Sequence, residues 1–175
     1  MCLNAARLPS RIDGGGNLKA ILHQDRKRWD QALISEGLEL LAASACGEEL
    51  TAYHVEAAIA GVHASAASVE TTAWGQIVSL YDALFMLRPS PVVALNRAMA
   101  IAQHEGPARG LEAIGVIKDL EQLSLYPFYP AALGELELRL GRGAAAAEHF
   151  RAALRLARNA SERRFLAERM AACSR

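Results

Sequence analysis

The stretch LGELELRLGRGAAAAEHFRAAL, residues 133–154, constrains the fold of this chain more than any other. Its apolar residues recur at helical spacing on both sides of a break made by Gly141, Arg142 and Gly143. Glycine commonly follows the last turn of a helix, because it adopts left-handed conformations without strain. The stretch therefore predicts two antiparallel helices joined by a tight turn, either as one hairpin of a bundle or as one unit of a repeat array.

Composition and helical spacing together predict an all-α fold. Ala and Leu dominate the 175 residues, β-branched residues are sparse, and aromatic residues make up only 6%. The apolar spacing predicts about nine helices. Besides the two helices of the stretch above, the clearest lie at residues 25–47, 51–65, 74–87, 92–104, 108–120 and 161–173.

The first 24 residues have a different pattern. Residues 10–22 lack a helical period, and three consecutive glycines at residues 14–16 are typical of a flexible linker. The residues before them are typical of the last turns of a helix that ends at Pro9, as expected for a fragment of a longer protein. We expect a truncated helix and Gly-rich linker over residues 1–24, and one helical domain over residues 25–175.

Self-similarity at a fixed period distinguishes an array from a bundle. Gly115 precedes Phe150 by 35 residues, and Tyr81 precedes Gly115 by 34. The expected turn glycines, Gly106 and Gly141, are also 35 residues apart. This is the period of a tetratricopeptide repeat, so the array is favoured over the bundle.

The resemblance to that family is most specific around Phe150. The family has a large apolar residue, then two small residues and an alanine at set distances from this position, and here they are Leu133, Gly134, Ala146 and Ala153. We expect the two helices to approach closely at Gly134 and Ala146, and Phe150 and Ala153 to receive the following helix. The resemblance implies a right-handed superhelix of tetratricopeptide-like helical hairpins.

The sequence departs from the repeat pattern at several positions. Glu137 replaces an aromatic residue of the family, and Arg158 replaces its terminal proline. The repeat over residues 92–125 is weaker, and residues 26–72 fit only as a divergent pair of helices. The signature positions of the repeat over residues 92–125 hold Met99, Leu111 and Gly115.

Two further motifs are unusual for a generic repeat: LHQDRKRWDQALISEGL at residues 22–38 and SPVVALNRAMAIA at residues 90–102. With RIDGGG, AAIAGVHA, IVSLYDAL and ERRFLAERM, they resemble the C-terminal extension of extracytoplasmic-function-type bacterial sigma factors that carry a tetratricopeptide-like domain. The resemblance runs from about Leu3 to Met170. It implies a role in transcription initiation through contacts with the N-terminal sigma domains, RNA polymerase or a regulator.

The chain lacks the promoter-reading parts of that family. It contains neither a helix-turn-helix with a basic recognition helix nor an aromatic-rich melting region. We therefore expect no direct nucleic-acid binding by this chain alone. The alternative function is a free-standing tetratricopeptide adaptor that binds a short peptide in its concave groove, and an enzyme is a more distant alternative.

Two groups of residues are candidates for partner binding. Asp25, Arg26 and Trp29 either begin a helix or form the docking edge for the sigma domains. If these residues begin a helix, Asp25 would cap that helix and Arg26 would pair with a neighbouring acid. Trp29 would then anchor the helix on the next one. Asn96 and Arg97 begin the first helix of a repeat, where they would hold a peptide backbone or carboxylate, or bond within their own helix.

Charge is balanced overall but unevenly distributed, with 19 basic and 19 acidic residues. Residues 1–30 hold six basic and three acidic residues, residues 31–150 hold six and fourteen, and residues 151–175 hold seven and two. The segments thus carry about +3, −8 and +5. This distribution favours self-complementary packing, with oligomers as one outcome, or a cationic partner. Solvated helix faces are the alternative.

No pattern predicts a catalytic, metal or cofactor site. His54 and Glu56 lack the downstream cysteines of a zinc deaminase, and His63 lies on a different helix face from His54. The sequence contains no HExxH, GxSxG or phosphate-binding loop. We expect a non-enzymatic protein without cofactors.

The cysteines and the apolar runs indicate the compartment. Cys2, Cys46 and Cys173 share no metal-binding spacing, and their odd number is typical of reduced cytosolic thiols. No apolar run approaches the roughly 18 residues of a membrane span. We therefore expect a cytoplasmic protein that does not bind membranes.

Overall fold

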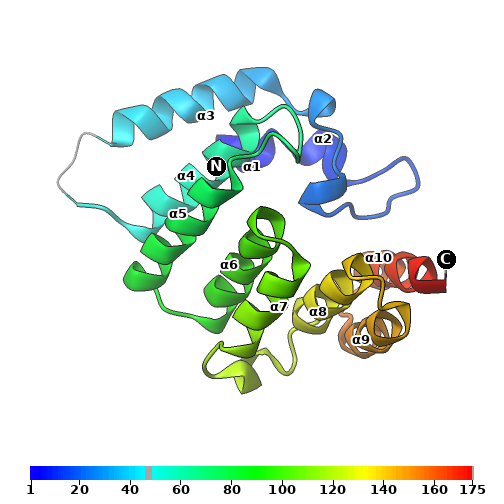
Figure 1. The fold of residues 1–175 in the computed structure, drawn as a ribbon. Helices are drawn as coiled ribbons and strands as arrows, with labels where there is room; N and C mark the ends of the chain where they lie inside the picture. Colours follow the sequence, from blue (N-terminus) through cyan, green and yellow to red (C-terminus); the bar gives the residue numbers. More distant parts are fainter. Residues whose placement is uncertain (46–48, 175) are drawn as a thin grey trace. The chain divides into compact units, whose positions relative to one another are not determined.

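The computed structural model describes residues 1–45 and 49–174, and within them it confirms an all-α fold of helical hairpins (Figure 1). The only pairing of extended backbone among these residues is an isolated bridge between Ile12 and Leu18. None of the helices in this part of the chain has the length and apolarity needed to cross a membrane. The α-helices are α1 (Cys2–Ala5), α2 (Leu8–Arg11), α3 (Gln31–Ser44), α4 (Ala52–Ser65), α5 (Trp74–Leu87), α6 (Pro91–His104), α7 (Pro107–Gly115), α8 (Phe128–Arg139), α9 (Gly143–Leu156) and α10 (Ala160–Ala171).

Four short 3₁₀ turns complete the regular structure of the described residues. They are η1 (Ile21–His23), η2 (Arg26–Arg28), η3 (Leu120–Leu123) and η4 (Ala172–Ser174). The helix expected over residues 108–120 ends at Gly115, and η3 follows it in the chain.

The first long helix begins later than expected. Its N-cap is Asp30 rather than Asp25, because the Asp30 carboxylate accepts hydrogen bonds from two backbone N–H groups of the first turn of α3, at 3.0 and 3.1 Å. Asp25 instead caps η2, where it accepts from the N–H of Lys27 at 3.0 Å. Both aspartates are good caps, and the buried Trp29 lies in extended conformation between the two helical segments.

The chain divides into two compact units, Met1–Pro89 and Ser90–Arg175. This division differs from the expected boundary after residue 24. Residues near the N-terminus belong to the first unit because Leu3 and Ala6 are buried there. The close approach of α1 to α3 depends on Gly37, where an added Cβ would lie 2.8 Å from Cγ of Leu3.

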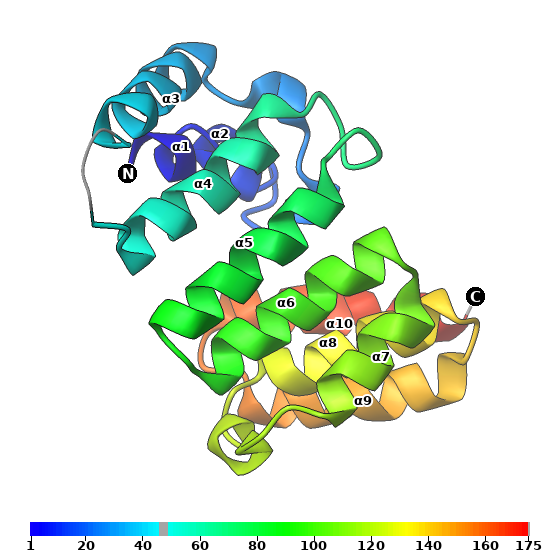
Figure 2. The same cartoon turned by 60° about the vertical axis from the view of Figure 1, so that its left-hand side comes forward.

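The second unit contains the two hairpins that the 35-residue spacing predicts. Helix α6 pairs with α7, and α8 pairs with α9 (Figures 1 and 2). Their turns contain Gly106 and Gly141, whose φ angles of +100° and +75° are values that residues with side chains rarely adopt. Both expected turn glycines thus lie in the turns of helical hairpins, and the assignment of these hairpins to tetratricopeptide repeats stays a prediction.

The close approach within the second hairpin is also confirmed. A Cβ added at Gly134 would lie 3.1 Å from the ring of Phe150 and 3.2 Å from the carbonyl oxygen of Ala146. Phe150 and Ala153 are almost fully buried and share a core with Leu166 of α10. Small residues at these positions thus allow α8 and α9 to touch, and the large ring fills the space beside them.

The first hairpin of this unit makes its close contact elsewhere. Gly110 of α7 faces Ala102 of α6, and an added Cβ there would lie 2.5 Å from Cβ of Ala102. Gly115 is exposed at the end of α7, and its neighbour Ile114 is the buried residue. The assignment of Gly115 to the position of Phe150 therefore fails as a packing equivalence, because Gly115 is the exposed last residue of α7 and the buried residue there is Ile114.

Polar interactions in the second unit join α8 to two helices that are not its neighbours in the chain, α10 and α6. Arg169 of α10 and Glu135 of α8 form a bidentate ion pair with N···O distances of 2.9 and 3.0 Å. Arg139 of α8 donates from Nη2 to the carbonyl oxygen of Ala102 at 3.0 Å. That carbonyl lies in the last turn of α6, where backbone acceptors lack intrahelical partners. The right-handed superhelical twist stays a prediction.

Gly110→Ala is expected to lower the free energy of unfolding by about 1–3 kcal/mol, because the new methyl group overlaps Ala102. Gly115→Ala is the matched control in the same helix, since nothing lies within 4 Å of its added Cβ. Urea unfolding followed by circular dichroism measures both. Equal stabilities of the two variants would contradict the proposed contact.

Candidate partner-binding site

Arg26 is a buried residue that joins three parts of the first unit. Its Nη1 donates to the carbonyl oxygens of His63 and Ala66, and its Nη2 donates to Oγ1 of Thr72, each at 2.9 Å. His63 lies in the last turns of α4, and Ala66 and Thr72 lie in the loop that leads to α5. Burial lowers the pKa of Arg26, while the nearby Glu70 carboxylate raises it.

These contacts differ from the expected pairing of Arg26 with a neighbouring acid. The planar guanidinium instead binds acceptors that α4 leaves without intrahelical partners near its C-terminus. Its Nε is buried without a hydrogen-bond partner among the described residues. With an exposed fraction of 7%, Arg26 offers little surface to another protein.

Trp29 is the centre of the small core beneath Arg26. Its ring nitrogen donates to Oγ of Ser10 at 2.7 Å, and the indole packs with Ala6 and Ile34. The guanidinium carbons of Arg26 and Arg7 lie 5.1 and 5.7 Å from the ring centroid, within the range of cation–π attraction. This geometry favours the interpretation of Trp29 as an anchor that holds the N-terminal residues on α3.

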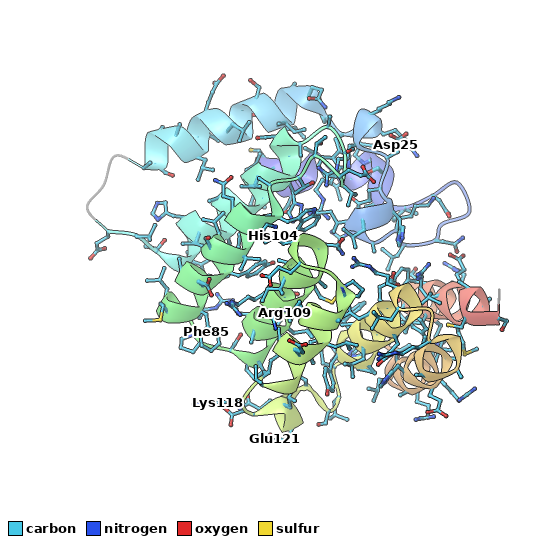
Figure 3. The ribbon with its side chains drawn as sticks, in the orientation of Figure 1. Asp25, Phe85, His104, Arg109, Lys118 and Glu121 are labelled. Carbon is cyan, nitrogen blue, oxygen red and sulfur yellow. The ribbon has the colours of Figure 1, made fainter. Side chains whose placement is uncertain are left out.

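The third residue of this group, Asp25, has a different environment. It is the exposed N-cap of η2, and within the described part of the chain its side chain makes only the capping hydrogen bond given above (Figure 3). The structure therefore brings Arg26 and Trp29 together in the interior and leaves Asp25 at the surface. Of the three residues, only Asp25 has a side chain open to a partner.

Asn96 and Arg97 lie on α6, in the other unit. Helix α6 begins at Pro91, and the hydroxyl of Ser90 accepts from the N–H of Val93 at 3.2 Å to cap it. The core face of this helix carries Val93, Leu95 and Ala98, whereas Asn96 is exposed and Arg97 is half-buried. The exposed amide of Asn96 is thus available for a ligand.

His63 is a functional-looking residue whose environment the sequence did not indicate. It is 8% exposed, its Nδ1 has no hydrogen-bond partner in the described part of the chain, and its ring meets Trp74 edge-on at 5.3 Å. Burial, followed by the charges of Arg26 and Arg7, lowers the pKa of His63 to about 4. The available signal was its spacing, four residues after the apolar Ile59 on the same helix.

The described residues contain no group of three or more His, Cys, Asp and Glu side chains placed to hold a metal ion. His54 is engaged locally, since its Nδ1 accepts from the backbone N–H of Thr51 at 3.2 Å in a capping box. Cys2 and Cys173 are half-buried free thiols. The expected third thiol, Cys46, lies outside the described residues.

Comparison with known proteins places the first candidate group inside a matched region. Residues 1–45 match the family of unknown function DUF6596. The chain is also 37% identical, over 166 residues, to an uncharacterized protein of Rhizobium meliloti (strain 1021), a match that covers 95% of this chain and 39% of that protein. The chain therefore spans about two fifths of the length of this relative. No solved structure matches the chain significantly.

Replacing Arg26 with Lys is expected to lower the free energy of unfolding by about 2–3 kcal/mol, because an ammonium group cannot span the three acceptors of the guanidinium. Arg28→Lys is the matched control at an exposed position of the same turn, with an expected change within about 0.5 kcal/mol. Denaturant unfolding measures both. If the Arg26→Lys chain is as stable as the unmodified chain but no longer binds a partner protein, Arg26 belongs to the docking edge instead.

The stability of the first unit is expected to depend on the titration of His63. The unfolded chain takes up this proton near pH 6.5 and the folded chain only near pH 4, so the free energy of unfolding falls as the pH falls through this window. The loss is on the order of 3 kcal/mol. Replacing His63 with Phe is expected to remove this pH-dependent loss of stability. Unfolding measurements between pH 7 and pH 4 test the prediction.

The control for this titration experiment is His104→Phe, the same substitution at an exposed histidine (Figure 3). The difference in the pH dependence of stability between the two variants separates the contribution of His63 from that of the carboxylates, which also titrate in acid. Identical pH dependence of the His63 and His104 variants would contradict the assignment.

Proposed function

We propose that this chain is a non-enzymatic protein-interaction domain of a sigma factor, which modulates transcription initiation in the bacterial cytoplasm. The observation that carries the proposal is the pair of hairpins in the second unit, with equivalent left-handed turn glycines 35 residues apart. Helical hairpins repeated at this period form extended surfaces that bind other proteins. The sigma-factor resemblance of the motifs around Trp29 and Asn96 supports the choice of partner.

The comparison with the longer relative is compatible with a domain role. The match covers nearly all of this chain but well under half of the Rhizobium protein. The corresponding segment of that relative therefore acts within a larger polypeptide. The partners we propose are the N-terminal sigma domains of such a polypeptide, RNA polymerase, or both, and we expect no cofactor and no direct nucleic-acid binding.

A second candidate, a peptide-binding adaptor, is supported by Asn96. First helices of tetratricopeptide-like hairpins line the concave face of these arrays, and an exposed amide there can donate to and accept from a peptide backbone. The adaptor and the sigma-domain proposals share this surface. They differ in whether the bound chain is a folded sigma domain or a short peptide.

Affinity capture with the purified chain tests the proposal. We expect it to retain separately expressed sigma domains or RNA polymerase, and not to retain promoter DNA at physiological salt. Asn96→Ala and Arg97→Ala are expected to weaken retention. Gln122→Ala and Lys118→Ala, at exposed positions of the same unit, serve as matched controls; Figure 3 labels Lys118. Tight promoter binding by the isolated chain, or retention of neither protein, would refute the proposal.

A further inference from the structure

Three cations of the first unit are brought together around α2: Arg7, Arg11 and Lys19. A short hairpin follows this helix and is closed by the bridge between Ile12 and Leu18 (Figure 1). The N–H of Lys19 donates to the carbonyl oxygen of Arg11 at 2.9 Å, so these two residues are neighbours across the base of the hairpin. We call Arg7, Arg11 and Lys19 the basic cluster.

A buried glutamine connects the third cation to the other two. Gln24 is 7% exposed, its Oε1 accepts from Nε of Arg7 at 3.3 Å, and its Nε2 donates to the carbonyl oxygen of Lys19 at 2.9 Å. The guanidinium of Arg7 also lies over the ring of Trp29. Nη1 of Arg7 reaches Oδ1 of Asn4 only at 3.5 Å, and its Nη2 donates to no described residue. Arg7 is therefore held in place with part of its donor fork unused.

The charges of the basic cluster repel one another. Burial, followed by the charges of Arg11 and Arg26, lowers the pKa of Arg7. Neither Arg11 nor Lys19 forms an ion pair with an acid in residues 1–45 and 49–174. A carboxylate placed between these cations would relieve the repulsion and favour their charged forms.

Asp13 is the acid of the hairpin itself, and its side chain closes the turn. Its Oδ1 accepts from the N–H groups of Gly15 and Asn17, each at 2.9 Å. Hydrogen bonds from Asn17 and Gly15, followed by the charge of Lys19, lower the pKa of Asp13, so this carboxylate is ionised at neutral pH. Asp13 therefore offsets one charge of the basic cluster, and the cluster keeps a net positive charge.

The other charges of residues 1–30 leave this region positive. They are Asp25, Arg26, Lys27, Arg28 and Asp30. The two aspartates cap η2 and α3, and the buried Arg26 is balanced by Glu70. The exposed Lys27 and Arg28 belong to η2, which packs against α2, so they add to the positive charge on this side of the unit.

An exposed apolar side chain accompanies the cations. Leu8 is 58% exposed and precedes Arg11 by three residues in α2, so the two side chains lie on the same side of the helix. A segment that carries both carboxylates and apolar side chains complements this combination. A phosphate backbone has no apolar counterpart for Leu8 and would be repelled by Asp13, which favours a protein partner over a nucleic acid.

We propose that the basic cluster binds an acidic amphipathic segment of a partner protein. Carboxylates of this segment face Arg11, Lys19 and the unused edge of Arg7, and an apolar side chain covers Leu8. Because Arg7 is already held in place, binding requires little further ordering of its side chain. The exposed charges select the sign of the partner and speed association. This inference rests on the proposed interaction role and adds the chemistry of the partner to it.

The probe is a synthetic amphipathic Leu/Glu peptide, compared with a Leu/Lys peptide of the same pattern and with a single-stranded oligonucleotide of matched charge. Fluorescence anisotropy with the whole chain is expected to detect binding of the Leu/Glu peptide alone, weakening as salt increases. Equal affinity for the two peptides, or binding of the oligonucleotide as tight as that of the Leu/Glu peptide, overturns the proposal.

A double charge variant tests the basic cluster directly. Arg11→Gln with Lys19→Gln changes two exposed side chains and is expected to weaken binding of the Leu/Glu peptide about fivefold and to flatten its salt dependence. Arg151→Gln with Arg155→Gln, at exposed positions of α9, makes the same change of charge in the other unit and is the matched control. Unchanged peptide binding by the folded double variant of the cluster overturns the proposal.

A second variant tests the apolar contact without changing any charge. Leu8→Ser is expected to weaken binding of the Leu/Glu peptide about fivefold and to leave its salt dependence unchanged. Val116→Ser, at a position that is 80% exposed in the other unit, is the control. Full affinity of the Leu8→Ser chain would contradict an amphipathic partner.

Affinity capture with the double charge variant separates this inference from the proposed function. If the variant loses the peptide yet retains sigma domains or polymerase as strongly as the unmodified chain does, the basic cluster does not serve those partners and this inference fails. If the unmodified chain binds the peptide through the basic cluster but retains neither sigma domains nor polymerase, the proposed function fails and this inference stands.

Discussion

The first unit depends on one guanidinium. Arg26 bonds to acceptors 37, 40 and 46 residues further along the chain, so a single side chain fixes the end of α4, the loop after it and the turn before α3. The same group lies over Trp29 and disfavours protonation of His63. Packing, loop conformation and ionisation in this unit therefore have a common origin.

The sequence predicted most of the second unit because its constraints are local. Turn glycines, capping residues and apolar spacing act within a few residues, so Gly106, Gly141 and the contact of Gly134 with Phe150 could be inferred before the structure. The contact of Gly110 with Ala102 could not be inferred in this way, because the repeat pattern does not require a small residue at the position of Gly110.

The candidate site was harder to predict because its contacts are distant in sequence. The motif that contains Arg26 and Trp29 is unusual, but nothing near it in the sequence specifies acceptors on α4 or the hydroxyl of Ser10. Asp25 and Asp30 are equivalent as local capping signals, and only the burial of Trp29 between them decides which one starts α3. The burial of Leu3 against Gly37 likewise determines that the N-terminal residues belong to the first unit.

The hydrogen bond from Arg139 to the carbonyl of Ala102 makes adjacent hairpins thermodynamically dependent on each other. The end of α6 is completed by a side chain of α8, so local opening of α8 leaves a backbone acceptor of α6 unsatisfied. Fraying should spread from one hairpin to the next rather than remain within one. In a repeat architecture this nearest-neighbour coupling carries cooperativity along the chain, and a partner that orders α8 also stiffens the helix that bears Asn96.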